Sequence, residues 1–201
     1  MSKKLIILIS ICTMCLFGGM VQAAPFGNGD FETGVLSPWW GWGDGGSVTI
    51  VPTGGVGGSQ GALITNFGGT YSTTLGQDID WSAGASIDGK ISLQYRADSW
   101  GGAGVAVKWF DSGWANIGWA WAQMYAGNGT DTGWQPFTAS SAVPGSAGTW
   151  IAPAGTAYAE IRVEQWSWGD VYVDNVVLTP EPATMILLGI GGLVALRRKH
   201  A

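Results

Sequence analysis

Apolar and polar residues alternate along several short segments of this chain, and glycine-rich stretches separate those segments. If residues 89–98 form a strand, Ile91, Leu93 and Tyr95 lie on one of its faces. The other segments with this pattern are residues 47–51, 61–65, 71–79, 105–111, 134–139, 159–166 and 170–178. No segment before the C-terminal tail has a convincing helical period. The sequence therefore predicts an all-β fold, a β-sandwich of the jelly-roll type.

The same alternation predicts which strand residues are buried. The side chains expected to face the core are Val105, Val107, Trp109, Ile161, Val163, Val171, Val173 and Val177. Glu160, Arg162 and Glu164 should face outward. These assignments place one hydrophobic face of each strand in the sandwich core.

The N-terminus has the pattern of an export signal. Lysines at positions 3 and 4 precede an apolar stretch from Leu5 to about Val21, and residues 21–23 form a small-x-small cleavage site. This pattern predicts a signal peptide at 1–23, removed by signal peptidase, the alternative being an uncleaved N-terminal anchor. Both cysteines, Cys12 and Cys15, lie within this segment. The mature chain is therefore expected to contain no disulfide.

The predicted domain, residues 24–178, is acidic. Between residues 24 and 180 there are four basic and 13 acidic side chains, a balance of −9. This charge disfavours nucleic acid as a partner, and it suits calcium or neutral sugars better.

The sequence predicts that the protein is not an enzyme. Its single histidine is His200, at the end of the tail, which excludes a Ser-His-Asp triad and a histidine-ligated metal in the domain. Paired carboxylates could serve a glycosidase, but no motif groups Asp98, Asp111, Asp131 and Asp170. We therefore assign no catalytic residue.

Thirteen tryptophans are the strongest signal in the composition. Trp40, Trp109 and Trp134 are expected in the core. Others stand among glycines, where burial is difficult; these are Trp42, Trp100, Trp114, Trp119, Trp121, Trp166 and Trp168. Trp119 and Trp121 would share a strand face, as would Trp166 and Trp168. Exposed indoles can stack on pyranose rings, so these seven residues are the candidate carbohydrate-binding residues. The alternative is a second packing layer or a surface used in assembly.

The C-terminal tail, residues 179–201, combines three elements. Pro180-Glu181-Pro182 precedes an apolar run of 14 residues, 183–196, and the basic cluster Arg197, Arg198 and Lys199 follows. A helix of this length covers about 21 Å, less than the roughly 30 Å of a bilayer core. The basic residues can snorkel and should stay on the cytoplasmic side. The tail is thus expected to be a weak, transient inner-membrane anchor; the alternative is a buried C-terminal core helix.

These three elements resemble the PEP-CTERM sorting signal. The resemblance implies recognition by a membrane-embedded exosortase, which is thought to cleave near Pro180, Glu181 and Pro182. It also implies a Gram-negative type of envelope, an association with exopolysaccharide, and a final location at the cell surface or in the extracellular matrix.

The domain resembles the jelly-roll carbohydrate-binding modules, which have a galactose-binding-like fold. "NGDFETG" at 28–34 and "VYVDNVVL" at 171–178 are similar to their first and last strands, and "GALIT", "LGQDID" and "TGWQPFTA" follow the same template. The resemblance implies a structural calcium held by Glu32 and Asp174, with Asp30 as a possible third ligand and backbone carbonyls completing the site. Alternatively, these carboxylates cap strand ends or bind backbone amides.

The sequence thus predicts a secreted, surface-sorted, non-catalytic protein that binds extracellular polysaccharide through exposed tryptophans. The rival interpretation is a structural matrix or adhesion protein that uses the tryptophan-rich surface for protein contacts.

Overall fold

The computed structural model describes residues 26–179, except residues 69, 70, 99, 101, 128 and 167. The described chain forms β1 (Trp40–Gly43), β2 (Gly46–Val51), the short 3-10 helix η1 (Val56–Gly58), β3 (Gly61–Asn66), β4 (Thr73–Asp80), β5 (Ile91–Ala97), β6 (Ala103–Phe110), β7 (Asn116–Tyr125), β8 (Gln135–Ala139), β9 (Ala147–Gly148), β10 (Tyr158–Gln165) and β11 (Gly169–Leu178). The predicted signal peptide and the predicted tail helix lie outside these residues.

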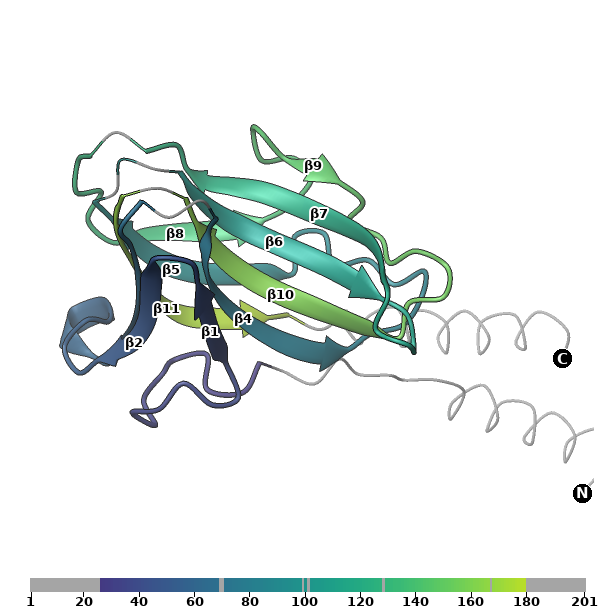
Figure 1. The fold of residues 1–201 in the computed structure, drawn as a ribbon, viewed down its shortest axis with the longest axis horizontal. Coiled ribbons are helices and arrows are strands. Elements are labelled where there is room, and N and C mark those ends of the chain that lie inside the picture. Colours follow the sequence, from purple (N-terminus) through teal and green to yellow (C-terminus); the bar gives the residue numbers. More distant parts are fainter. Residues whose placement is uncertain are drawn as a thin grey trace, which may run out of the picture.

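The strands form two antiparallel sheets packed face to face (Figure 1). One has six strands in the order β1-β4-β10-β6-β7-β9, and the other has five in the order β2-β3-β11-β5-β8. Strands distant in sequence are neighbours in both sheets, as when β10 pairs with β4 and β6. The predicted all-β jelly-roll sandwich is confirmed.

The core lies between the sheets and contains the side chains that the alternation assigns to it. Ile91, Leu93 and Tyr95 are buried from the five-stranded sheet, and Val105, Val107, Trp109, Ile161 and Val163 are buried from the six-stranded sheet. Tyr95 also donates from its hydroxyl group to the carbonyl of Met124 on β7, and burial raises the pKa of this phenol. This bond ties the two sheets together through the core.

The tryptophan core differs from the prediction. Trp109 is fully buried and donates its indole N–H to the Thr149 carbonyl. Trp40 and Trp134 are only half-buried. The other buried tryptophans are Trp39, Trp81 and Trp150, none of which was predicted to lie in the core. Each of these three donates its indole N–H within the described chain, and this compensates for burial of a polar group.

The segment 28–34 is not the first strand of the sandwich, contrary to expectation. It forms turns in which Asn28 and Phe31 adopt positive φ values of 51° and 56°. The turns put the Phe31 ring in the core, 5.8 Å from the Trp39 ring. The chain thus covers one end of the core before β1 starts.

The last strand departs from strict alternation near its end. Asn175 has a φ of 52°, and the pairing of β11 with β5 shifts between Asp174 and Val177. As a result, Val176 and Leu178 face the core while Val177 is exposed. The expectation that Val177 shares the buried face is wrong because a β-bulge reverses the alternation.

Within residues 26–179, as far as they are described, no helix has the length and apolar character needed to cross a membrane.

Candidate functional site

The outward face of the six-stranded sheet carries a cross-strand row with an indole at each end and an arginine at its centre. Register places Trp40 beside Gly76, Gly76 beside Arg162, Arg162 beside Ala106, and Ala106 beside Trp121. The Trp40 indole lies over Gly76, since a Cβ at residue 76 would be 2.2 Å from Cζ2 of Trp40. Ala106 is buried, so Arg162 is the charged centre of the row and an indole stands at each end. We call this surface, together with the outward residues of β4, β10 and β7 next to it, the aromatic face.

Trp119 and Trp121 share the aromatic face, as the sequence predicts. They lie opposite Lys108 and Ala106 on β6. A Cβ at Gly104 would lie only 2.3 Å from Cζ2 of Trp121, so this indole can lie against β6 because residue 104 is glycine. Trp119 is 51% exposed, and it is therefore the more accessible of the two.

Trp166 joins the aromatic face, but Trp168 does not. The Trp166 ring packs against Trp121, with 4.3 Å between their centroids. Trp168 instead lies against Gly68, in the loop between β3 and β4. A Cβ at residue 68 would be only 2.4 Å from Nε1 of Trp168. The expectation that Trp166 and Trp168 share a strand face is wrong, because β10 ends at Gln165 and a turn leads into β11.

Arg162 fixes the charge at the centre of the face. Its Nη2 donates to Oε2 of Glu160 at 2.6 Å, and its Nη1 donates to Oε1 of Glu164 at 3.4 Å. Its guanidinium also lies 5.5 Å from the Trp40 ring centroid, within the range of a cation–π contact. These contacts fix the arginine between the two carboxylates and the indole.

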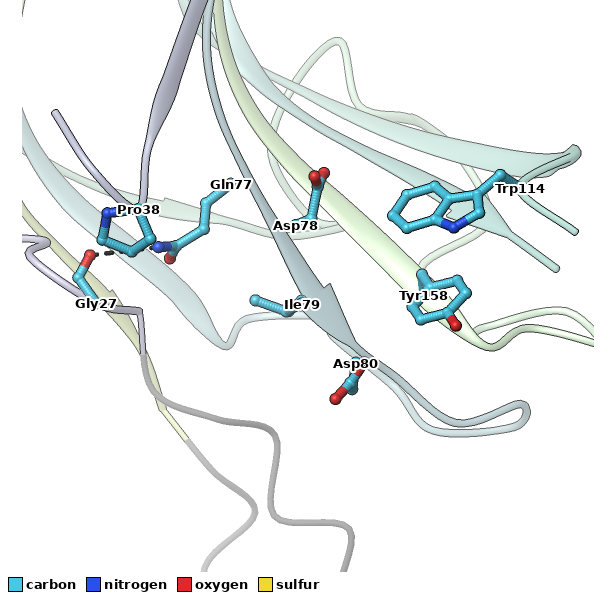
Figure 2. Close-up of a pocket in the computed structure, with 8 residues that line it drawn as sticks. All are labelled: Gly27, Pro38, Gln77, Asp78, Ile79, Asp80, Trp114 and Tyr158. Carbon is cyan, nitrogen blue, oxygen red and sulfur yellow. Dashed lines mark hydrogen bonds between the residues drawn. The ribbon is translucent and has the colours of Figure 1, made fainter. Parts of the chain in front are cut away.

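Trp114 forms the far end of the face. Its indole stacks on Tyr158 at 4.5 Å with an interplanar angle of 6°. A hollow beside this pair is lined by residues of β4 and of the N-terminal segment (Figure 2). Tyr158, Asp78 and Asp80 are not among the site residues predicted from the sequence. The alternation in "QDID" puts both aspartates on one face, and this signal could have identified them.

The remaining predicted tryptophans gather at one end of the sandwich. Trp100 and Trp168 are exposed in the loops that join β5 to β6 and β10 to β11. The backbone N–H of Trp100 donates to the Trp168 carbonyl at 2.9 Å, which connects these loops. Trp42, at the edge of the aromatic face, lies 6.4 Å from the ring of Tyr71, which is in the loop between β3 and β4. The seven candidates therefore belong to two surfaces and do not form one continuous platform.

Three of the aspartates considered for catalysis, Asp98, Asp111 and Asp131, accept hydrogen bonds within the fold. Asp131 accepts a hydrogen bond from Nε of Arg96 at 2.9 Å, and hydrogen bonding from Arg96 lowers the pKa of Asp131. Asp98 accepts from the backbone N–H of Asp170 at 3.2 Å. Asp111 accepts from the N–H groups of Gly113 and Ala115 and shapes the turn before β7.

Two of the three predicted calcium ligands contact one segment of the chain. Oδ2 of Asp174 accepts from the Val56 N–H at 2.8 Å and from the Ser59 hydroxyl at 3.1 Å. Oε1 of Glu32 accepts from the Gln60 N–H at 2.9 Å. Asp30 accepts a hydrogen bond within its own turn, from the N–H of Glu32 at 3.4 Å. The part of the chain that the structure describes contains no group of three or more acidic, histidine or cysteine side chains placed to hold a metal.

The comparisons with known proteins identify the tail. Residues 178–199 match the PEP-CTERM protein-sorting motif, so the predicted resemblance of the tail is confirmed. This motif indicates an exported protein that is sorted to the cell surface. The search of curated proteins found no match.

Solved structures with a similar fold include one viral protein and two carbohydrate-binding modules. The enzymatically active domain of tailspike protein 4 of bacteriophage CBA120 is 16% identical over 77% of this chain and 21% of its own, with a TM-score of 0.51. The C-terminal family 22 carbohydrate binding module of Clostridium thermocellum Xyn10B is 11% identical over 78% and 98%, with a TM-score of 0.49. The CBM22-1 xylan-binding domain of Paenibacillus barcinonensis Xyn10C is 12% identical over 75% and 90%, with a TM-score of 0.48. This chain spans about a fifth of the tailspike chain, and that similarity shows a shared fold.

Proposed function

We propose that this protein binds extracellular polysaccharide, without catalysis, on the aromatic face. The observation that carries the proposal is the row in which Trp40 and Trp121 stand on either side of Gly76, Arg162 and Ala106. A sugar ring presents C–H groups that stack on an indole and hydroxyls that bind charged side chains. The ends of the row suit the first interaction and the centre suits the second.

The arrangement suits a chain of sugars better than a single small molecule. Aromatic side chains recur at the β1 edge, at the β7 edge and beside Tyr158 at the far end. Successive sugars of a polymer could therefore each meet an aromatic ring. The sorting motif places the protein at the cell surface, where polysaccharide is accessible.

Trp119→Ala is expected to weaken polysaccharide binding by about 1–3 kcal/mol, by analogy with aromatic stacking on nucleic-acid bases. Because Trp119 is half exposed, the melting temperature should stay close to that of the wild type. Affinity electrophoresis of the purified protein through a panel of soluble polysaccharides measures the effect. Trp121 is a poorer choice, since it packs on Trp166 and its loss would also reduce stability.

The matched control is Trp168→Ala, which removes an exposed indole at the loop end and should leave binding to the same polysaccharides unchanged. If Trp119→Ala binds every tested polysaccharide like the wild type, the aromatic face is not the binding surface. If only Trp168→Ala loses binding, the binding surface is the loop end and not the aromatic face.

A second candidate function is adhesion through protein contacts at the loop end. The observation that favours it is the exposure of Trp100 and Trp168, at 73% and 59%, together with Phe67 and Tyr71. The loop end lies at the start of β11, whereas the described chain ends just after the last residue of β11. There the Thr179 N–H donates to the Lys90 carbonyl. The loop end is therefore at the opposite end of the sandwich from Thr179, the last described residue. Self-association that is lost in Trp100→Ala, with polysaccharide binding absent throughout, would favour adhesion.

We also propose a structural calcium between the N-terminal turns and β11. Glu32 and Asp174 both contact the segment from Val56 to Gln60, so an ion there could be held by two carboxylates and backbone carbonyls. Asp30 would need to turn toward the segment to take part. Bound calcium would then connect the start of the domain to its last strand.

Calcium at about 100 times its dissociation constant would stabilise the fold by about 2.7 kcal/mol, so EDTA should lower the melting temperature by ~5–10 °C. Glu32→Gln should abolish this response while keeping the side chain's size. Asp174→Ala is a less specific test, because it also removes the acceptor for the Val56 N–H and the Ser59 hydroxyl. A wild-type melting curve that ignores both EDTA and added calcium would exclude the ion.

A further inference from the structure

A hollow of about 510 Å³ opens over the second half of β4, beyond the end of β1. β1 pairs only with residues 73–76 of β4, so residues 77–80 have no strand partner on that side. Gly27 and Pro38 stand on one side of β4, and Trp114 and Tyr158 stand on the other (Figure 2). The volume falls within the range of about 300–1,000 Å³ that is usual for small-ligand sites.

The aromatic wall of the hollow is held in place before any ligand arrives. Trp114 has a φ of 62°, a conformation that bulky residues rarely adopt and that costs backbone energy. Asp111 supports this turn by accepting hydrogen bonds from the N–H groups of Gly113 and Ala115, at 2.8 and 2.9 Å. The turn presses one face of the indole against Tyr158, yet 53% of Trp114 remains exposed. The exposed indole surface is available to a second ring.

The charged groups of the hollow are both carboxylates. Asp78 and Asp80 are exposed on the same face of β4, and neither side chain has a hydrogen bond or ion pair with any described residue. Gln77 also lines the hollow, but its side chain is on the opposite face of β4 from the two aspartates and its Oε1 is buried, so a ligand beside the aspartates does not reach it (Figure 2). Its amide nitrogen donates to the Gly27 carbonyl at 3.4 Å, which turns the amide toward the N-terminal side. The two unpaired carboxylates therefore favour a ligand that donates hydrogen bonds to them and is positively charged.

The charges on the neighbouring strands also favour a positively charged ligand. Register places Glu160 beside Asp78 and Tyr158 beside Asp80, so no cation adjoins either aspartate on β10. Lys108 lies one strand further, beside Glu160, and Arg162 is engaged by Glu160 and Glu164. A sugar acid would meet repulsion here, and a neutral sugar would leave two carboxylates without a counter-charge.

We propose that this hollow is a subsite for a hexose that carries a free, protonated amino group, as in a glucosamine unit of a polysaccharide. The pyranose ring stacks on Trp114, and the ammonium group lies beside the carboxylates of Asp78 and Asp80. The inference rests on the proposed polysaccharide-binding function and narrows its ligand class.

Titration calorimetry of the purified protein tests the subsite with two matched probes, a β-1,4-linked glucosamine oligosaccharide and its fully N-acetylated counterpart. The amino form should bind about tenfold or more tightly, because N-acetylation removes the charge-assisted hydrogen bonds. Its advantage should shrink as salt rises, since the carboxylates are exposed and screened.

The double variant Asp78→Asn, Asp80→Asn should lose this preference and bind both probes alike, while Trp114→Ala should weaken both. The control Asp44→Asn removes one exposed carboxylate in the turn between β1 and β2, and it should change neither affinity. Melting temperatures verify that each variant folds.

The outcomes separate the subsite from the general function. Equal affinity for the two probes, or tighter binding of the N-acetylated form, overturns the subsite. If the subsite fails in this way but Trp119→Ala still weakens polysaccharide binding, the proposed function stands without the subsite. If neither probe nor any other polysaccharide binds, both proposals fall.

Discussion

Arg162→Ala is expected to lower the free energy of unfolding by about 3–5 kcal/mol, the usual loss when one partner of a buried ion pair is removed. Glu160 is itself buried and pairs with Arg162. Without Arg162, its carboxylate would have only Lys108, on the neighbouring strand β6, as a cation beside it in the described sheet. The Trp40 ring would also lose its cation–π contact. Urea denaturation followed by tryptophan fluorescence measures the change.

The structure supplies a matched control in a second arginine–carboxylate pair. Arg96 and Asp131 form a similar ion pair, but their side chains are 43% and 46% exposed. Exposed pairs contribute little because water and salt screen them. Arg96→Ala should therefore leave the unfolding midpoint nearly unchanged.

A third variant separates the charge from the packing. Replacing Arg162 with Met, together with Glu160→Gln and Glu164→Gln, removes all three charges at once and should recover most of the lost stability. If Arg162→Ala and Arg96→Ala cost the same, the ion network on the aromatic face is not a stabilising feature. Loss of polysaccharide binding in the triple variant would show that the charges serve the ligand and not only the fold.

Most strands could be predicted because apolar and polar residues alternate along much of their length. All eight predicted segments are found within a few residues of their expected bounds, since a sheet with one face in the core imposes period two on the sequence. Val177 is a failure of this rule: a single left-handed residue, Asn175, reverses the alternation, and asparagine alone does not signal a bulge. The segment 28–34 failed for a related reason, because its positive φ values at Asn28 and Phe31 depend on tertiary packing.

The candidate site could be predicted only where its residues are close in sequence. Trp119 and Trp121 are two apart on one strand, so their common face follows from local geometry. Trp40 lies in the same row as Trp121 only because β1, β4, β10, β6 and β7 pair in that order, and jelly-roll crossovers determine this order. Trp166 and Trp168 have the same spacing as Trp119 and Trp121, yet the end of β10 separates them. Spacing therefore predicts a shared face only inside a strand.

Replacing Pro180, Glu181 and Pro182 with alanines is expected to leave the protein uncleaved in the inner membrane. These residues lie within the matched sorting motif, 178–199, and outside the described residues. Proline fixes φ and disfavours helix at the residue before it, so Thr179 and Glu181 should keep the wild-type segment extended and open to a protease. Alanines would instead favour continuation of the predicted helix toward the domain.

Intact-mass measurement of protein from the native cell envelope decides the question. The wild-type surface protein should lack the residues beyond about 182, including the basic cluster from Arg197 to Lys199, while the alanine variant should retain them and stay in the inner-membrane fraction. Thr184→Ala is the matched control, because it changes a tail residue outside the Pro-Glu-Pro element and should be processed normally. Recovery of surface-located wild-type protein with His200 still attached would mean that the tail is a permanent anchor. In that case the exposed Trp100 and Trp168, at the end of the sandwich away from Thr179, would be held facing away from the membrane.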